Sequence, residues 1–247
     1  MPKWCPAKVT RKDVWTDGLF TLHVQCPELK SFTPGQFLQL AVVEDDKRIN
    51  RPYSVASPFE ETIEFFIVLV EDGELTPKLW ALEPGDEVEV SEKAAGSFTL
   101  KKTPDANTLW LAGTGTGLAP YIAMLRTAEP WERFKKIVLV HGVRHAADLA
   151  YTDEMNQLSE ERGDQFSFVQ ALTREEASGT LSGRLPALVE NGELESAAGC
   201  PLDAATSVIM LCGNPAMLDT MEELLEKREM KRHKRKEPGH IVVERYW

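Results

Sequence analysis

Hydrophobic and polar positions alternate in short stretches through the first hundred residues of the chain. The stretches are rich in Val, Leu, Ile and Phe, and Pro-Gly and Asp-Gly turn signals separate them. Strands at this spacing are typical of an antiparallel barrel or sandwich. The pattern predicts strands over residues 20–25, 36–43, 63–70 and 86–91, and a short helix over residues 76–82.

The pattern changes after residues 101–105, where apolar runs begin to alternate with helical stretches. Continuous apolar strands that alternate with helices imply a parallel sheet covered on both faces. We therefore expect two domains, an antiparallel β-barrel over residues 1–102 and an α/β domain with a parallel sheet over residues 103–247. The strands predicted in the second domain are 108–112, 137–141, 166–172, 207–212 and 241–243, and the helices are 118–129, 148–160, 185–191 and 216–230.

A glycine-rich turn, Gly113-Thr-Gly-Thr-Gly-Leu-Ala-Pro120, joins the first strand of this second domain to its first helix. Such a turn lets backbone N–H groups approach a diphosphate at the positive end of a helix. The spacing departs from the usual dinucleotide fingerprint, because Leu118 or Pro120 stands where the third glycine belongs. The strand–turn–helix context still predicts nucleotide binding.

Three arginines follow the next two strands of the predicted parallel sheet. Folds that bind NAD place an acid near the end of the second strand for the ribose 2′-hydroxyl, whereas here that strand continues into Arg144. Arg174 and Arg184 follow the third strand. A guanidinium group binds phosphate oxygens through a planar fork. Three such groups at neighbouring strand ends predict a 2′-phosphate site, and hence NADP rather than NAD.

Composition excludes several classes of protein. The chain has 247 residues, of which 43% are hydrophobic and 27% charged, so it is not a disordered chain. No apolar run approaches the ~20 residues that span a bilayer, and the first residues lack the pattern of a signal peptide. The four cysteines form no C-x-x-C pair, which argues against zinc and iron–sulfur sites. We expect no metal and a reducing, cytoplasmic setting.

The formal net charge of −11 argues against broad nucleic-acid binding, but the charge is unevenly distributed. The stretch Lys227–Lys236, called here the basic run, holds seven of the 28 Lys and Arg residues and one acid, which leaves 21 − 38 = −17 for the rest. One interpretation is a solvated basic helix face. The other is a local positive field that steers an acidic partner.

Five motifs, taken in their order along the chain, resemble those of the ferredoxin–NADP reductase family, and the ending resembles its short bacterial branch, the flavodoxin/ferredoxin–NADP reductases. The resemblance covers essentially the whole chain. The motifs are Arg51-Pro-Tyr-Ser54, Gly73-Glu-Leu-Thr76, Ala95-Gly-Ser-Phe98, Gly113 to Pro120, and Leu211-Cys-Gly-Asn-Pro215, followed by the ending Val243-Glu-Arg-Tyr-Trp247.

The resemblance implies an FAD site in the first domain. Arg51 would bind the FAD pyrophosphate, Tyr53 would pack on the isoalloxazine ring, and Ser54 would lie near flavin N5. The other residues that the resemblance assigns to FAD are Pro52, Ile67, Val68, Leu69, Val70, Glu74, Leu75, Thr76, Thr116, and the terminal Tyr246 and Trp247, which would fold over the flavin and adenine.

The resemblance also implies an NADP site and three catalytic positions. Besides Ser54, these are Cys212, which would lie beside the nicotinamide C4, and Glu244, which would relay protons. Hydride transfer needs no covalent step, so Cys212 is interpreted as a positioning residue. Arg245 departs from the plant-type ending. The residues assigned to NADP are Gly115, Thr116, Val143, Arg144, Thr173, Arg174, Arg184 and Asn214.

The function that the resemblance implies is electron exchange between NADPH and ferredoxin or flavodoxin, with hydride passing to FAD N5 in the cleft between two domains of a monomer. Three alternatives stay open: a reductase component for an oxygenase, a free-flavin reductase or diaphorase, and a non-catalytic NADP-dependent redox sensor. The absence of a clustered cysteine motif excludes a built-in iron–sulfur domain. The complete flavin motif and the aromatic ending count against a pure sensor.

Overall fold

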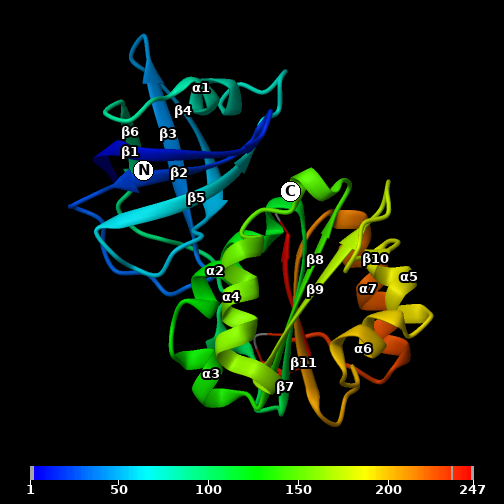
Figure 1. Cartoon of the computed structure of the whole chain (residues 1–247). Coiled ribbons are helices and arrows are strands. Elements are labelled where there is room, and N and C mark those ends of the chain that lie inside the picture. Colours follow the sequence, from blue (N-terminus) through cyan, green and yellow to red (C-terminus); the bar gives the residue numbers. More distant parts are fainter. Residues whose placement is uncertain (1–2, 235, 246–247) are drawn as a thin grey trace. The chain divides into compact units, whose positions relative to one another are not determined.

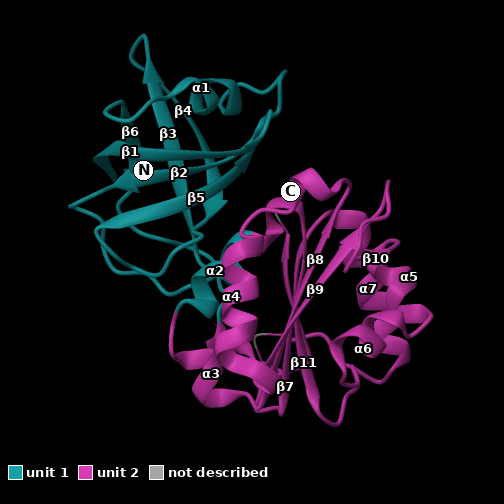
Figure 2. Cartoon of the chain, in the orientation of Figure 1, with its two compact units in different colours: residues 1–99, 119–126 teal, residues 100–118, 127–247 magenta. Residues whose placement is uncertain are grey.

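The computed structural model describes residues 3–234 and 236–245, and the chain divides by its internal contacts into two compact units (Figure 2). Unit 1 comprises Met1–Thr99 and Ala119–Arg126, and unit 2 comprises Leu100–Leu118 and Thr127–Trp247. The domain boundary between residues 102 and 103 stays a prediction. None of the described helices is long and apolar enough to cross a membrane.

Unit 1 is built on a six-stranded antiparallel sheet with the strand order β4-β3-β6-β1-β2-β5 (Figure 1). A bridge between Val55 and Phe65, and a 2.8 Å hydrogen bond from Ala56 N to Glu64 O, join the chain after β4 to β5 at the other edge. The sheet therefore curls back on itself, as the sequence predicts. Its elements are β1 Trp4–Thr16, β2 Leu19–Gln25, β3 Phe37–Glu44, β4 Lys47–Ser54, β5 Thr62–Val68, α1 Thr76–Ala81 and β6 Glu87–Ser91.

The sequence pattern misses β1 and β4. In β1, the inward positions Cys5, Ala7 and Val9 are buried, but they are small and stand among charged residues, so the period of two is faint. In β4, Pro52 interrupts the apolar pattern. A proline is tolerated there because β4 is at the edge of the sheet order and need not donate to a second neighbour.

Unit 2 is built on a parallel six-stranded sheet with the order β10-β9-β8-β7-β11-β12, which confirms the predicted α/β architecture. Figure 1 shows α3 and α4 on one face of this sheet, and α5, α6 and α7 on the other. Its elements are η1 Leu100–Lys102, β7 Thr108–Thr114, η2 Gly115–Leu118, α3 Glu129–Arg133, β8 Lys136–Val143, η3 Ala146–Asp148, α4 Thr152–Arg162, η4 Gly163–Gln165, β9 Phe166–Leu172, β10 Leu181–Ser182, α5 Leu185–Glu190, α6 Glu193–Ala198, β11 Ser207–Gly213, α7 Pro215–Lys227 and β12 Ile241–Arg245.

Burial on both faces explains why these strands read as continuous apolar runs. Every residue of β11 is buried, and so is every residue of β8 after Lys136. On the face covered by α5 and α7, Val140 and Leu211 belong to one apolar cluster with Leu188 and Leu218. A parallel sheet holds its strand ends in one row, so residues that follow these strands are brought to a common edge.

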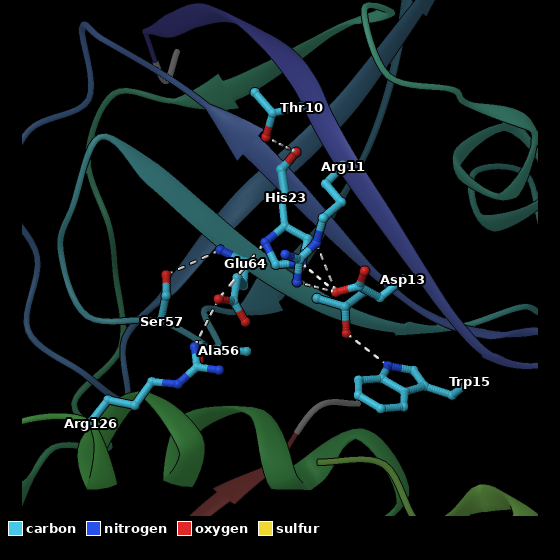
Figure 3. A network of polar contacts seen from close by, with 10 residues as sticks. Thr10, Arg11, Asp13, Trp15, His23, Ala56, Ser57, Glu64 and Arg126 are labelled. Atoms are coloured by element: carbon cyan, nitrogen blue, oxygen red, sulfur yellow. Dashed lines mark hydrogen bonds and ion pairs between the residues drawn. The ribbon is translucent and has the colours of Figure 1, made fainter. Parts of the chain in front are cut away.

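The helix α2, Ala119–Leu125, follows η2 directly but packs within unit 1. Its Tyr121 ring lies 6.0 Å from the ring of Phe98. Arg126, just beyond the helix, forms a 2.8 Å ion pair with Glu64 of β5 and donates to the carbonyl of Ala56 at 3.3 Å (Figure 3). The glycine turn of unit 2 thus leads into a helix that is anchored on the strands of unit 1.

Candidate functional site

The predicted flavin motif lies at the end of β4. The exposed Arg51 guanidinium is 3.4 Å from the carboxylate of Glu74 and donates to Asn50 O at 2.7 Å. Tyr53 is half-buried, with its ring edge-on to Phe65 at 6.3 Å between centroids. Burial raises the pKa of the Tyr53 hydroxyl to about 12, so the phenol is neutral. The edge of unit 1 therefore presents a cation beside a neutral aromatic ring.

Ser54 completes the motif with a buried hydroxyl. Its residue is 4% exposed, and its Oγ has no hydrogen-bond partner within the described part of the chain. A buried hydroxyl without a partner costs about 1–3 kcal/mol. This position therefore fits a ligand that brings a hydrogen-bond partner of its own.

The predicted pyrophosphate turn is closed by its own side chain. Thr76 Oγ1 accepts from Val70 N at 2.9 Å and donates to Val70 O at 3.1 Å. A Cβ on Gly73 would stand 2.9 Å from Val70 O, so only glycine fits there. The Leu75 side chain is in the core at 2% exposure. The side chains of Leu75 and Thr76 are thus committed to the fold, which leaves the backbone and Glu74 to meet a ligand.

The strand predicted to flank the flavin ends in exposed apolar side chains. Ile67 is buried, whereas Val68 and Val70 are 44% and 55% exposed. The backbone N–H of Leu69 donates to Gly18 O at 2.6 Å, which fixes this segment against the turn between β1 and β2. Exposed valines next to a polar motif form a surface that a planar ring can cover.

In unit 2, the glycine turn interlocks with the end of β11. A Cβ on Gly117 would stand 2.6 Å from the carbonyl oxygen of Cys212. One on Gly213, whose φ is +129°, would stand 2.8 Å from Thr114 O. Asn214 N also donates to Thr114 Oγ1 at 2.9 Å. The two segments approach so closely that glycine is required on both sides.

The three arginines singled out in the sequence meet at neighbouring strand ends of unit 2. Arg174 N donates to Arg144 O at 3.1 Å, and Gly183 N, next to Arg184, donates to Leu172 O at 2.8 Å. All three arginines are exposed, and their side chains have no hydrogen-bond or ion-pair partner among residues 3–234 and 236–245. Three unpaired cations gathered at one edge are suited to a dianionic group.

Val143 and Thr173 join these strand ends. The carbonyl of Val143 accepts from Thr173 N at 3.1 Å and from Thr173 Oγ1 at 3.3 Å. The Val143 side chain is 7% exposed. Both residues therefore support the position of Arg174 and Arg144, and their roles as direct NADP contacts stay a prediction.

Cys212 and Glu244 are register partners in the parallel ladder of β11 and β12. Cys212 is fully buried. The Glu244 carboxyl has no hydrogen-bond or ion-pair partner in the described residues, and burial raises its pKa to about 7. The neighbouring Arg245 turns to α7 instead, where it pairs with Asp219 at 2.7 Å and Glu222 at 3.0 Å. Arg245 therefore does not pair with Glu244.

The remaining predicted site residues are placed as follows. Asn214 is exposed and caps α7, its side-chain oxygen accepting from Met217 N at 3.2 Å. Gly115 is exposed with φ +54°, and Thr116 is half-exposed beside it. Tyr246 and Trp247 lie outside the described residues.

The basic run is only partly available for a partner. Arg228 donates to Glu195 at 2.7 Å and to Val189 O at 2.6 Å, and Arg232 pairs with Glu222 at 3.0 Å. Four lysines stay exposed and unpaired within the described residues, namely Lys227, Lys231, Lys234 and Lys236. The run lies between the end of α7 and the start of β12. It is therefore at the amino-terminal edge of the sheet, opposite the edge that carries Glu244.

The sequence predicts His141 only as the end of a strand, whereas the structure places it beside the glycine turn. It is fully buried in β8, and its Nε2 lies 3.0 Å from the carbonyl oxygen of Gly115 in the glycine turn. Its signal in the sequence is a single polar residue within an otherwise apolar run, Ile137-Val-Leu-Val-His141.

The two units correspond to two known domain families. Residues 6–98 match the oxidoreductase FAD-binding domain, and residues 111–223 match the oxidoreductase NAD-binding domain. Among solved structures, a ferredoxin NADP+ reductase from Neisseria gonorrhoeae with bound FAD and NADP superposes with a TM-score of 0.95, at 30% identity and full coverage of both chains.

Relatives of established name match over the full length. The flavodoxin/ferredoxin–NADP reductase of Escherichia coli (strain K12) is 47% identical over 100% of both chains. The ferredoxin–NADP reductase of Azotobacter vinelandii is 36% identical over 94% of this chain and 93% of its own. The chain therefore belongs to the family of the flavodoxin/ferredoxin–NADP reductases, oxidoreductases that combine an FAD-binding and an NAD-binding domain.

Proposed function

We propose that this protein exchanges electrons between NADPH and a one-electron carrier, ferredoxin or flavodoxin, by way of a bound FAD. The observation that carries the choice of NADPH is a group of three exposed arginines at neighbouring strand ends of unit 2, whose side chains have no partner in the part of the chain that the structure describes. The names of the full-length relatives support the carrier class.

Arg144, Arg174 and Arg184 would bind the 2′-phosphate of NADPH. A phosphate monoester carries up to two negative charges at neutral pH, and a planar guanidinium binds two of its oxygens at once. A carboxylate suited to a ribose 2′-hydroxyl would instead be expected for NADH. The backbone of Gly115 and Thr116 would then meet the remainder of the nucleotide, together with Asn214.

The residues at the end of β4 fit FAD. The Ser54 hydroxyl, which has no partner within the described residues, would form a hydrogen bond with the flavin, and Tyr53 would stack on the flavin ring. Arg51 would release Glu74 and bind the pyrophosphate instead. The exposed Val68 and Val70 would be covered. When bound, the flavin supplies the exchange between two-electron and one-electron chemistry that protein side chains cannot perform.

Cys212 and Glu244 would act at the nicotinamide. A fully buried Cys212 fits a positioning role, because its side chain would form one wall of the nicotinamide site and hydride transfer needs no nucleophile. Glu244, with its pKa raised to about 7, can hold or release a proton at neutral pH. It would relay the proton that accompanies reduction.

The basic run is proposed to act on the carrier through its field rather than through contact. Its exposed lysines add a local positive potential to a chain whose net charge is −11. Monomeric state and cytoplasmic location stay predictions from the sequence and the resemblance.

The test of the function is an anaerobic titration of the purified protein, in which the visible flavin spectrum is followed with NADPH and, in parallel, NADH. We expect a bound flavin that bleaches at far lower NADPH than NADH concentration. A colourless protein that FAD cannot reconstitute would refute the enzyme. Turnover with free flavin or dyes but with neither flavodoxin nor ferredoxin would favour a diaphorase.

The arginine site is tested by Arg174→Ala and Arg184→Ala, with Lys135→Ala as the control. Lys135 is an exposed cation at the opposite edge of the same sheet. Each arginine variant should weaken NADPH binding about 10- to 100-fold and change NADH binding less than twofold, since a charge-assisted contact contributes about 1.5–3 kcal/mol. Equal losses for both nucleotides would refute the 2′-phosphate role.

Steering is tested by the double variant Lys231→Gln/Lys234→Gln against the control Lys8→Gln/Lys135→Gln, which removes the same charge elsewhere. Carrier kcat/KM should fall at low ionic strength in the first variant only, and the difference should vanish at high salt. Equal effects of the two double variants would mean that net charge, and not the basic run, sets the rate.

A further inference from the structure

The buried His141 has no role in the function proposed above. It lies on β8 between Gly113 of β7 and Gln170 of β9, its partners in the parallel registers, and is 0% exposed. An imidazole in such a position is costly to bury unless it is hydrogen-bonded. Within the described residues its ring makes one hydrogen bond, which joins Nε2 to the carbonyl oxygen of Gly115 at 3.0 Å.

This contact fixes the state of the ring. A carbonyl oxygen can only accept, so Nε2 carries the hydrogen. Nδ1 is buried and has no partner in the described part of the chain, and a second hydrogen there would have no acceptor. His141 is therefore neutral, and burial lowers its pKa to about 4.

The bond also sets the direction of a peptide group in the glycine turn. The described chain contains no cis peptide bond, and in a trans peptide the carbonyl oxygen and the following N–H point in opposite directions. Because the Gly115 carbonyl points inward to His141, the N–H of Thr116 points away from the core. At the start of η2, this N–H has no partner within the turn.

The tip of the turn has few other restraints. Gly115 is exposed, has φ +54°, and has no atom within 4 Å of the place where a Cβ would stand. Gly117, by contrast, is held against the carbonyl of Cys212. Besides the backbone hydrogen bonds of η2 itself, the contact with His141 therefore restrains the orientation of the Gly115–Thr116 peptide.

We propose that His141 is a positioning residue that holds the Gly115 carbonyl inward, so that the Thr116 N–H is presented outward as a donor to the nucleotide diphosphate. This inference rests on the proposed NADP site. His141 would contribute to the affinity for the diphosphate of the nucleotide, whereas the three arginines would contribute to the affinity for its 2′-phosphate.

The test compares His141→Gln with His141→Asn. The amide nitrogen of glutamine reaches about as far as Nε2, whereas that of asparagine is one methylene short, so both variants bury an amide and only the first can donate to Gly115. Binding of NADP+ and of adenosine 2′-monophosphate to the oxidised holoprotein is measured by calorimetry. The second ligand carries the 2′-phosphate but no diphosphate.

We expect His141→Asn to raise the Kd of NADP+ about tenfold, the effect of one hydrogen bond to a charged group, and to change the Kd of adenosine 2′-monophosphate less than twofold. His141→Gln should restore most of the NADP+ affinity. An unchanged NADP+ Kd in His141→Asn would overturn the inference, and so would equal weakening of both ligands. Should His141→Asn fail to retain FAD, His141→Leu provides the same comparison. Failure of the wild-type protein to bind NADP+ would instead refute the proposed function.

Discussion

Cys212 and Glu244 are register partners at the carboxyl ends of adjacent parallel strands. Cys212 is fully buried, and the Glu244 carboxyl, whose pKa is raised to about 7, has no hydrogen-bond or ion-pair partner among residues 3–234 and 236–245. The next residue, Arg245, pairs with Asp219 and Glu222 of α7 and not with Glu244. Perturbed carboxyls of this kind are typical of functional sites.

The pH dependence of flavin reduction should report Glu244. Burial raises its pKa to about 7, so the protonated form that can give up a proton is lost as the pH rises through 7. We expect the NADPH-driven rate to fall over pH 6–8 with an apparent pKa near 7, and this step to be absent in Glu244→Gln. The measurement is stopped-flow bleaching of the flavin across that range. A step that persists unchanged in the variant would assign the titration to another group.

His141 should make the protein sensitive to acid. Its pKa is lowered from 6.5 to about 4 by desolvation, against the opposing effects of the Gly115 carbonyl and Asp148. The unfolded chain therefore binds the proton more readily, so the stabilisation present above pH 6.5 is lost as the pH falls toward 4. The shift corresponds to about 3 kcal/mol at most.

His141→Gln, which cannot titrate, should remove that part of the acid sensitivity. The measurement is the difference in Tm between the wild-type holoprotein and the variant from pH 7.5 to pH 4.5. We expect the wild type to lose several degrees more than the variant. Parallel curves would show that the ring is not desolvated in solution.

Gly117→Ala should destabilise unit 2 by overpacking. The added Cβ would stand 2.6 Å from the Cys212 carbonyl, so one of the two segments must move. We expect a loss of about 2 kcal/mol and weaker NADP+ binding. The control is Gly163→Ala, which has φ +52° and open space around its Cβ position. It should cost about 1–3 kcal/mol through backbone strain alone and leave NADP+ binding unchanged.

Arg126 should stabilise unit 1 through Glu64. The two side chains form a 2.8 Å ion pair and are 26% and 15% exposed, and Glu64 also lies 3.8 Å from Nδ1 of His23 (Figure 3). Arg126→Ala leaves a largely buried carboxylate without its cation, which we expect to cost about 2 kcal/mol after allowance for solvent screening.

The double variant Arg126→Ala/Glu64→Gln should be more stable than Arg126→Ala alone, because it removes the unpaired charge as well. The free energy of unfolding of the wild type, each single variant and the double variant is measured by urea unfolding of the holoprotein. Flavin release and far-ultraviolet circular dichroism follow the transition. Additive losses would indicate that the two side chains do not interact in solution.

Much of this protein could be predicted from its sequence because its signals are local. Period-two patterns and turn residues predict the antiparallel unit, and apolar strands followed by helices predict the parallel sheet. The arginines could be placed together because parallel strands end at one edge. The order of the motifs along the chain indicated the family, and the full-length relatives confirm it.

The tertiary structure decided what local patterns do not encode. It pairs Arg245 with α7, so that Arg245 does not pair with Glu244, and it commits the Thr76 hydroxyl to the turn at Val70. It also brings His141 to the Gly115 carbonyl, 26 residues away in sequence. Each of these outcomes depends on which strands are neighbours and on their register. Side-chain partners across a sheet are set by packing of the whole chain, whereas strand periodicity and turn chemistry are set by a few consecutive residues.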